Sequence, residues 1–400
     1  MNQLYLEQLL SEVKARSGGM ILSVEGKPEA VVLSIEKYNQ LISSQSLPSG
    51  AQVASSENPA EPQPFQDGPA VLFHPKTILV TGGAGYIGAH VARHLVNAGH
   101  RVIILDNLTS GKKQNIPENA KFIEGDVGDF NLLRDIFAAD KVEVVMHFAA
   151  SIEVEESVKE PGKYLSNNAI NTARLLAAMD EAGVKEIIFS STAAVYGTQE
   201  KQPIPETAKK APQNPYGHSK LIAEETIAYY CRHKSFKAVV FRYFNACGSD
   251  FDGKIQTSHS SHLLAKLMEA VISRDVVFTI HGNDYPTHDG TAVRDYVHVL
   301  DIVEAHLIAM EKLSGLEGFN EYNIGTGKGC SVLEMVGAVA EILNKIVPME
   351  PGPRRVGDAE CAVADNQKIR RELGFEPKFS EIETIIKTSY YQAQNNRPPV

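Results

Sequence analysis

Short runs of Ile, Val and Leu alternate with longer amphipathic stretches from Lys76 onward. The runs have the length of strands, and the stretches between them, of about ten residues or more, have the pattern of helices. Strands separated by helices pair in parallel, because a parallel connection needs a crossover. The pattern therefore predicts an α/β fold with a doubly wound parallel sheet, whose strands lie at residues 77–81, 101–106, 121–124, 143–147, 186–190 and 237–241.

The regular alternation ends near Gly248. Beyond it, loop signals rich in Gly, Asn, Asp and Pro interrupt the pattern at residues 282–286 and 351–353. We expect residues 76–248 to form a Rossmann-type domain. Residues 249–395 are expected to form a smaller, mostly C-terminal α/β domain, with some segments returning to the sheet.

The first 75 residues have a different character. Residues 1–42 predict a small α+β segment with a helix at 5–15, strands at 20–24 and 30–34, and a helix at 35–42. Residues 43–75 are rich in Ser, Pro, Gln and Glu, which predicts a flexible linker. Residues 26–34 and 36–38 resemble the N-terminal part of the Phd/YefM antitoxins, which implies dimerisation more than DNA binding.

Composition narrows the class of partner. A net charge of −10 gives no broad attraction to nucleic acid or to an anionic membrane, so small-molecule partners are favoured. The sequence predicts no membrane span and no signal peptide, since no apolar run approaches about 18 residues. The cysteines show no CxxC spacing, which favours free thiols in a reducing cytoplasm; they are Cys231, Cys247, Cys330 and Cys361.

A glycine-rich turn follows the first strand of the sheet. Residues 81–88 place Gly82, Gly85 and Gly88 between an apolar run and a helix that begins at Tyr86. This arrangement turns the backbone sharply and presents N–H groups to a pyrophosphate at a helix N-terminus. It predicts a dinucleotide site, but does not say what chemistry the dinucleotide serves.

Carboxylates and apolar residues at later strand ends refine this site. Asp106 ends the second strand, where a carboxylate accepts hydrogen bonds from ribose hydroxyls and repels a 2′-phosphate, so NAD is favoured over NADP. The alternative is that Asp106 only begins the turn at 106–108. Asp126 is placed near the adenine, and residues 148–150 near the cofactor.

Tyr216 and Lys220 lie four residues apart on one face of a helix that Pro215 begins. An ammonium beside a phenol, near a positive nicotinamide, lowers the pKa of the phenol. Tyr230 and Lys234 repeat the spacing in the same helix and are interpreted as a surface contact. The first pair is favoured because Ser190 to Thr192, at the end of the fifth strand, bring a hydroxyl that can share the reacting proton.

The motifs taken together resemble the UDP-glucose 4-epimerases, a family of extended short-chain dehydrogenases/reductases. The resemblance extends over residues 76–395. Segments 282–286 and 289–296 are its specific part, because the wider superfamily shares only the earlier ones. The matching segments are 81–88, 106–108, 147–150, 190–197, 215–220, 242–245, 282–286 and 289–296.

The resemblance implies an isomerase that inverts C4 of a UDP-sugar with tightly held NAD. Tyr216 would be the base that takes the proton of the 4-hydroxyl group, Thr192 would share that oxygen, and Lys220 would tune the phenol and hold the nicotinamide ribose. The hydride passes to NAD⁺, the 4-keto sugar swings about its diphosphate, and the hydride returns to the other face.

The resemblance also implies two sets of binding residues. The cofactor set is Gly82, Gly85, Tyr86, Ile87, Gly88, Asp106, Asn107, Asp126, Val127, Phe148, Ala149, Ala150, Asn168, Ser190, Tyr216, Lys220 and Tyr243. The UDP-sugar set is Thr192, Tyr216, Phe244, Asn245, His262, Leu263, Arg294, Arg355, Asp358 and Ala362. Arg294 and Arg355 suit a diphosphate, because guanidinium groups bind phosphate with paired hydrogen bonds.

Three positions depart from the family pattern. Ile152 replaces a lysine common in the family, and Ala265 replaces a proline. Ala362 stands where a tyrosine accompanies restriction to UDP-glucose and UDP-galactose. A small side chain there leaves room for a 2-acetamido group, so we expect UDP-GlcNAc and UDP-GalNAc to be substrates as well.

Other functions remain as alternatives. A nucleotide-sugar 4,6-dehydratase is disfavoured, because Ala193 and Ala194 stand where that family has Asp and Glu. A UDP-glucuronate decarboxylase or epimerase is a closer rival. An NAD-sensing regulator with a DNA-binding N-terminal segment is the alternative from another class. We therefore expect a cytoplasmic homodimer that acts on a UDP-sugar and has no metal, membrane or nucleic-acid partner.

Overall fold

The computed structural model describes residues 19–24, 27–33, 74–256, 262–273, 275–355 and 359–395. The chain divides into two compact units, Met1–Val71 and Leu72–Val400. In the first unit, β1 (Gly19–Val24) and β2 (Lys27–Leu33) pair as an antiparallel hairpin. They overlap the predicted strands 20–24 and 30–34, whereas the predicted helices 5–15 and 35–42 lie outside the described residues.

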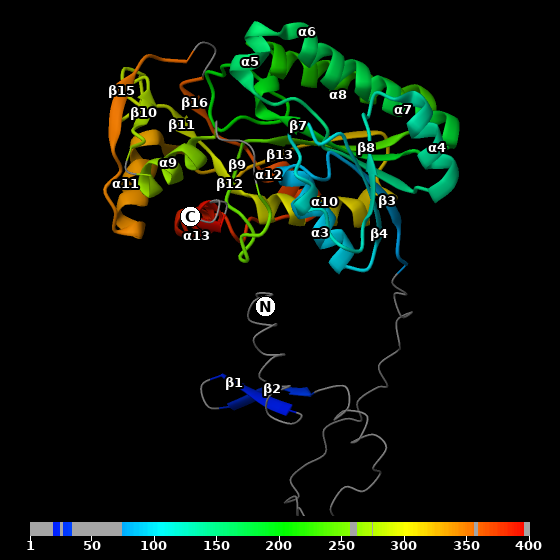
Figure 1. Cartoon of the computed structure of the whole chain (residues 1–400), viewed down its shortest axis with the longest axis horizontal. Coiled ribbons are helices and arrows are strands. Elements are labelled where there is room, and N and C mark those ends of the chain that lie inside the picture. The colour runs from blue at the N-terminus through cyan, green and yellow to red at the C-terminus, as the bar shows by residue number, and fades with distance from the viewer. Residues whose placement is uncertain are drawn as a thin grey trace, which may run out of the picture. The chain divides into compact units, whose positions relative to one another are not determined.

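A parallel sheet of seven strands forms the centre of the second unit (Figure 1). Its order is β13-β8-β7-β6-β3-β4-β5. The strands are β3 (Thr77–Thr81), β4 (Arg101–Asp106), β5 (Lys121–Glu124), β6 (Val144–His147), β7 (Glu186–Thr192), β8 (Lys237–Tyr243) and β13 (Phe319–Ile324). The predicted doubly wound fold is confirmed, and β13 adds a strand from the late part of the chain.

Helices cover both faces of this sheet, because each strand buries side chains in two directions. Ile78 and Val80 pack with α3 (Tyr86–Asn97), α10 (Val299–Leu313) and α12 (Gln367–Leu373). Leu79, between them, packs on the opposite face with α4 (Phe130–Asp140), α7 (Asn171–Ala182) and α8 (Pro215–Lys234). Figure 1 shows the two helical layers on either side of the strands.

The strand order reverses between β3 and β6. From β3 the chain moves to β4 and β5 on one side, and from β6 to β7 and β8 on the other. Such a switch point leaves a crevice at the carboxyl ends of the strands, where open α/β sheets bind ligands. Strands β7 and β8 each extend two residues beyond their predicted ends, to Thr192 and Tyr243, which carries both side chains to this edge.

Three small sheets follow β8. One pairs β9 (Asn245–Cys247) with β12 (Tyr296–His298), and another pairs β10 (Phe278–His281) with β15 (Met349–Gly352). The third joins β14 (Cys330–Ser331), β11 (Val293–Arg294) and β16 (Cys361–Ala362). Their apolar core includes residues of α9 (Leu263–Ile272), α11 (Val332–Leu343) and α13 (Ile382–Asn395).

A fully buried ion pair ties α8 to the sheet. Arg242 on β8 is 0% exposed, and its guanidinium group donates to both carboxylate oxygens of Glu224 at 3.0 and 2.9 Å. The same guanidinium donates to the Tyr196 hydroxyl at 2.8 Å. Bidentate geometry and a third acceptor compensate for the desolvation of both charges.

We predict that Arg242→Met lowers the free energy of unfolding by about 3–5 kcal/mol, because it leaves the buried Glu224 carboxylate with the partly exposed Lys210, at 3.5 Å, as its remaining cation. Urea denaturation measures the loss. The double variant Arg242→Met/Glu224→Leu removes both charges and is expected to recover much of the stability. A single variant within about 1 kcal/mol of wild type would show that the pair is dispensable.

Candidate active site

Glycines shape the turn between β3 and α3. Gly82 has a φ of +70°, and a Cβ atom there would lie 2.6 Å from the backbone nitrogen of Ala149. A Cβ atom on Gly88 would lie 2.3 Å from the carbonyl oxygen of Gly82. Neither position accepts a side chain, so the turn packs against the segment after β6 and leaves the N-terminus of α3 at the crevice. This cradle fits the pyrophosphate of a dinucleotide.

Asp106 stands beside the cradle at the end of β4. Its carboxylate accepts the N–H groups of Ala84 at 2.9 Å and Leu108 at 2.8 Å, and burial raises its pKa. The hydrogen bond from Leu108 shows that Asp106 also stabilises the turn at 106–108, which was the alternative role considered for it. A carboxylate has about four acceptor positions, so these two hydrogen bonds leave capacity for ribose hydroxyls.

The adjoining edge of the sheet brings Asn107 and Asp126 together. The Asn107 amide donates to the Asp126 carboxylate at 2.9 Å, and both residues are exposed. Asp126 also accepts the backbone N–H of Gly128 at 2.7 Å. Val127, which lies between Asp126 and Gly128 in the sequence, is buried. The two polar side chains thus form an exposed rim next to Asp106, where the adenine end of the cofactor is expected.

Helix α8 carries Tyr216 and Lys220 to the carboxyl end of β7. The Asn214 side chain caps the helix by accepting the N–H of Gly217 at 2.8 Å, and Pro215 occupies its first turn. The Lys220 ammonium donates to the Ser190 carbonyl oxygen at 2.8 Å and lies 4.8 Å from the centre of the Phe189 ring. Burial lowers the pKa of Lys220 to about 7, with Glu224 opposing the shift.

Tyr216 has a raised pKa in the protein. Burial is the main cause and the Glu153 carboxylate adds to it, whereas a hydrogen bond with Thr192 acts in the opposite direction. The protein side chains alone thus do not lower the pKa of the phenol, and the joint effect of Lys220 and a positive nicotinamide remains a prediction. The buried lysine loses its own charge near neutral pH, so a further positive group is needed to favour the phenolate.

A cavity of about 920 Å³ joins these groups. It brings together residues from the sheet edge, α8, α9 and the small sheets. The predicted site residues that line it are Tyr86, Ile87, Phe148, Ala150, Ser190, Thr192, Tyr216, Lys220, Tyr243, Phe244, Asn245, His262, Leu263, Arg294 and Arg355. Ile152 and Ala265, the two departures from the family pattern, line it as well.

Other predicted residues are not among those that line this cavity. They are Gly82, Gly85, Gly88, Asp106, Asn107, Asp126, Val127, Ala149, Asn168 and Ala362. Asp358 lies outside the described residues. Most of the cofactor residues in this group belong to the cradle and to the rim around Asp106.

Asn168 connects two segments that border the site. Its amide nitrogen donates to the carbonyl oxygen of Ser151 at 2.9 Å and to the Ser219 hydroxyl at 3.0 Å, and its oxygen accepts the N–H of Ser151 at 2.8 Å. Both amide N–H groups are thereby used within the protein. The residue ties the segment after β6 to α8, next to Lys220.

The two arginines of the UDP-sugar set are positioned differently. Arg294 on β11 is in register with Ala362 on β16, and Asp295 fixes this pairing by accepting the N–H groups of Ala364 at 3.1 Å and Gly327 at 2.9 Å. Arg355 lies 3.6 Å from the Glu155 carboxylate. The Glu155 carboxylate is exposed, so a bound diphosphate would replace it as the partner of Arg355.

Sequence reasoning missed Glu153, which lines the cavity and acts on the pKa of Tyr216. It stands directly after Ile152, and no motif marks it. The interpretation of Tyr230 and Lys234 as a surface pair fits the structure, because Lys234 is half exposed and forms an ion pair with Asp180 at 3.0 Å.

Two classes of feature are absent from the residues that the structure describes. None of their helices is long and apolar enough to cross a membrane. No group of three or more His, Cys, Asp or Glu side chains within these same ranges could hold a metal ion.

Comparison with known proteins identifies the family. Residues 78–325 match the NAD dependent epimerase/dehydratase family. The chain belongs to this family. The UDP-glucose 4-epimerase of Lacticaseibacillus casei is 40% identical over 322 residues, which cover 80% of this chain and 97% of that protein. NAD is therefore the cofactor, and the cradle at Gly82 and Gly88 is the part of the chain that fits it.

Solved structures agree with this assignment. The UDP-glucose 4-epimerase from Brucella ovis in complex with NAD is 39% identical, has a TM-score of 0.76, and matches over 79% of this chain and 97% of its own. The UDP-Glc/GlcNAc 4-epimerase from Campylobacter jejuni is 38% identical, has a TM-score of 0.70, and matches over 80% and 99% of the two chains.

The buried lysine predicts a pH dependence of stability. Burial lowers the pKa of Lys220 from 10.5 to about 7, so the unfolded chain binds more protons between these values. The burial of Lys220 therefore lowers the free energy of unfolding by its full amount below about pH 7, and this penalty disappears as the pH rises toward 10.5. The gain in free energy of unfolding of Lys220→Met over wild type should therefore be largest near neutral pH and should disappear at alkaline pH.

Urea denaturation of the two proteins, both freed of nucleotide, at several pH values between about 7 and 10 measures this difference. The predicted result is a free energy of unfolding that rises faster with pH in wild type than in Lys220→Met. Parallel pH profiles would contradict the prediction.

Proposed function

We propose that the chain is a UDP-glucose 4-epimerase that interconverts UDP-galactose and UDP-glucose with NAD held throughout. One observation carries the proposal. Tyr216, Thr192 and Lys220 meet in the same cavity as Arg294 and Arg355, beside the dinucleotide cradle. This arrangement supports a proton acceptor and two diphosphate-binding groups that act on one substrate.

Tyr216 acts as the base in this proposal. Its phenolate removes the proton from the 4-hydroxyl group of the sugar, and the Thr192 hydroxyl shares that oxygen. Bound NAD would accept a hydride from C4 and later return it, and its positive nicotinamide would favour the phenolate. Lys220, anchored on the Ser190 carbonyl oxygen, adds positive charge when protonated and orients the ribose with its remaining N–H groups.

Inversion requires that the 4-keto sugar present both faces to the same atoms. The diphosphate is the fixed point in this motion, held by Arg294 and Arg355, while Phe244, Asn245 and His262 line the cavity around the nucleotide end. Tyr216 then returns the proton to the oxygen on the other face. A single base therefore serves both directions, with no net oxidation.

We also propose that the protein is a homodimer located in the cytoplasm. A homodimer is supported by exposed apolar side chains on adjoining elements, Ile170 in the turn 165–170 before α7 and Tyr229 on α8. A cytoplasmic location is supported by the cysteines, all of which are free. The rival functions, a UDP-glucuronate enzyme and an NAD-sensing regulator, have no comparable observation in their favour.

Tyr216→Phe tests the role of the base. We expect a loss of turnover by about 10²–10⁴-fold, because the variant lacks the proton acceptor, while NAD stays bound. The assay follows conversion of UDP-galactose to UDP-glucose by chromatography, with no NAD added. Tyr230→Phe is the matched control in the same helix and should keep full activity. Substantial activity in Tyr216→Phe would exclude the assigned base.

Ala362 supports a wider substrate range. It packs beside Phe244, a residue of the cavity wall, and its backbone is in register with Arg294. Ala362 is not among the residues that line the cavity, but it packs against the cluster that includes Phe244 of the cavity wall, so a larger side chain there would crowd that wall. We therefore propose that UDP-GlcNAc and UDP-GalNAc are interconverted as well, since their 2-acetamido group needs an uncrowded wall.

Ala362→Tyr is expected to abolish turnover of UDP-GalNAc and to retain turnover of UDP-galactose, because the phenol ring takes the space of the acetamido group. The ratio of kcat/KM for the two substrates measures the effect. Ala362→Gly, which adds no bulk, should leave the ratio near that of wild type. Failure of the wild-type protein to convert UDP-GalNAc would refute the wider range.

A further inference from the structure

Residues 248–256, named the strap here, connect β9 to the part of the chain that leads to α9. The strap begins at Gly248, where φ is +81° and a Cβ atom would lie 2.4 Å from the ring of His298. It therefore starts flat against the N-terminus of α10. Beyond the strap, the described chain resumes at His262 and Leu263, which line the cavity.

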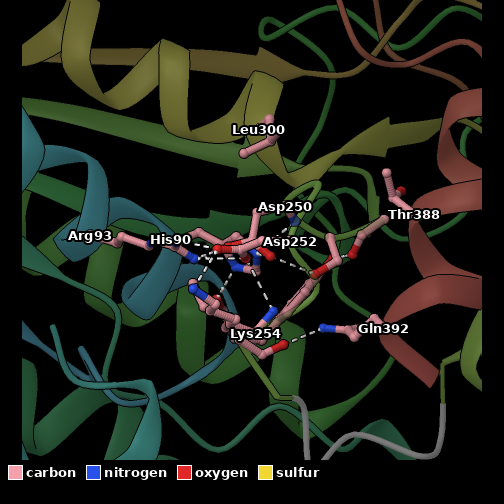
Figure 2. Close-up of polar contacts among 12 residues, drawn as sticks. His90, Arg93, Asp250, Asp252, Lys254, Leu300, Thr388 and Gln392 are labelled. Carbon is pink, nitrogen blue, oxygen red and sulfur yellow. Dashed lines mark hydrogen bonds and ion pairs between the residues drawn. The ribbon is translucent and has the colours of Figure 1, made fainter. Parts of the chain in front are cut away.

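A fork of charges fastens the middle of the strap to α3. The Arg93 guanidinium donates to Asp250 at 2.5 Å and to one carboxylate oxygen of Asp252 at 2.9 Å, and it also contacts the second oxygen of Asp252. Figure 2 shows Arg93 pointing at these two carboxylates. We call these three residues the clasp. They come from segments more than 150 residues apart.

His90 and Tyr86 connect the clasp to the start of the cradle. The N–H of Asp250 donates to His90 Nε2 at 3.2 Å, so the other ring nitrogen carries the proton and donates to the Tyr86 carbonyl oxygen at 2.7 Å. Burial lowers the pKa of His90 to about 4 and keeps this tautomer neutral. The Tyr86 hydroxyl donates to the Gly248 carbonyl oxygen at 2.6 Å.

The far end of the strap returns to the same cradle. Asn115 donates to the carbonyl oxygens of Ala84, at 3.0 Å, and of Gln256, at 2.8 Å, and accepts the N–H of Gln256 at 2.9 Å. Gln392 on α13 donates to the Ile255 carbonyl oxygen at 2.6 Å. The strap is thus tied at its start to Tyr86 and at its end, through Asn115, to Ala84, and it also packs on α13.

We propose that the clasp formed by Arg93, Asp250 and Asp252 positions the strap as a retaining element for the dinucleotide, and that Arg93 is a positioning residue for the epimerase reaction. This inference rests on the proposed function. Because the strap is bonded directly to Tyr86 and through Asn115 to Ala84, and because it leads toward α9, loosening it should free NAD and weaken the UDP-sugar site together.

The geometry explains why the clasp acts as a unit. Asp250 is buried and Asp252 is partly buried, so two carboxylates close together need the guanidinium charge to remain ionised. Arg is suited to this place, because its planar fork serves two acceptors at once, which an ammonium does not. Removing Arg93 leaves the two carboxylates facing each other with Lys254, 3.6 Å from Asp252, as their remaining charged partner, which favours movement of the strap away from α3.

The test measures NAD retention by the purified holoenzyme. Wild type, Arg93→Lys, Arg93→Met and Asp252→Asn are incubated with charcoal well below their unfolding temperatures, and NAD that remains bound is extracted and quantified over time. Arg134→Met is the matched control, since Arg134 forms an exposed ion pair with Glu181 at 3.1 Å. KM for UDP-galactose is measured with NAD added in excess.

We expect NAD release from Arg93→Met to be faster than from wild type by about tenfold or more, with Arg93→Lys intermediate, Asp252→Asn accelerated, and a raised KM. Wild-type release rates in Arg93→Met would overturn the inference even if its Tm falls, and so would equal acceleration in Arg134→Met. If Arg93→Met does not fold, Arg93→Lys and Asp252→Asn decide in the same way. Wild type that holds no NAD would refute the proposed function and this inference together.

Discussion

Helix α8 must dock on the sheet with the Lys220 ammonium taken out of water, and the arrangement of the site depends on this contact. The ammonium reaches the Ser190 carbonyl oxygen at 2.8 Å. One turn later, Glu224 accepts the Ser191 hydroxyl at 2.5 Å and the Arg242 fork. One residue earlier, Ser219 meets the Asn168 amide. Three polar side chains of the helix therefore fix it against three separate segments.

This docking determines which groups can react. Thr192 is the last residue of β7, next to the residue that Glu224 holds, so its hydroxyl is brought to Tyr216 by the same contacts that bury Lys220. The burial that gives this precision also disfavours charge on both Tyr216 and Lys220. The protein side chains supply geometry, and a bound NAD would supply positive charge that stabilises a phenolate.

The sequence predicts the sheet well, because its strands are buried on both faces and appear as short apolar runs such as the one around Leu79. The glycine-rich turn, Tyr216 and Lys220 are predictable for a similar reason, since each depends on neighbours within a few residues. Asn168 is different. The family resemblance implies a cofactor contact for it, but its partners Ser151 and Ser219 come from segments whose proximity only the fold creates.

The clasp and Glu153 show the same limit more strongly. Arg93 has the ordinary place of a helix-surface arginine, and Asp252 that of a loop carboxylate; their pairing joins positions 159 residues apart. Glu153 has no motif, and its influence on Tyr216 arises only because α5 (Val154–Lys159) begins beside the cavity. Local pattern identifies residues whose function follows from their neighbours in sequence, whereas pKa values and long-range ion pairs depend on the completed packing.

Retention of the cofactor and mobility of the sugar place opposite demands on one cavity. A dinucleotide that accepts a hydride and gives it back within one turnover must stay bound between the two transfers, while the sugar must turn between them. The cradle, the strap and α3 are cross-linked through Tyr86, Arg93 and Asn115, and the adjoining cavity of about 920 Å³ is lined by residues of both the cofactor set and the UDP-sugar set. The cross-links around the cradle therefore suit retention of the dinucleotide, while the cavity leaves the sugar room to turn.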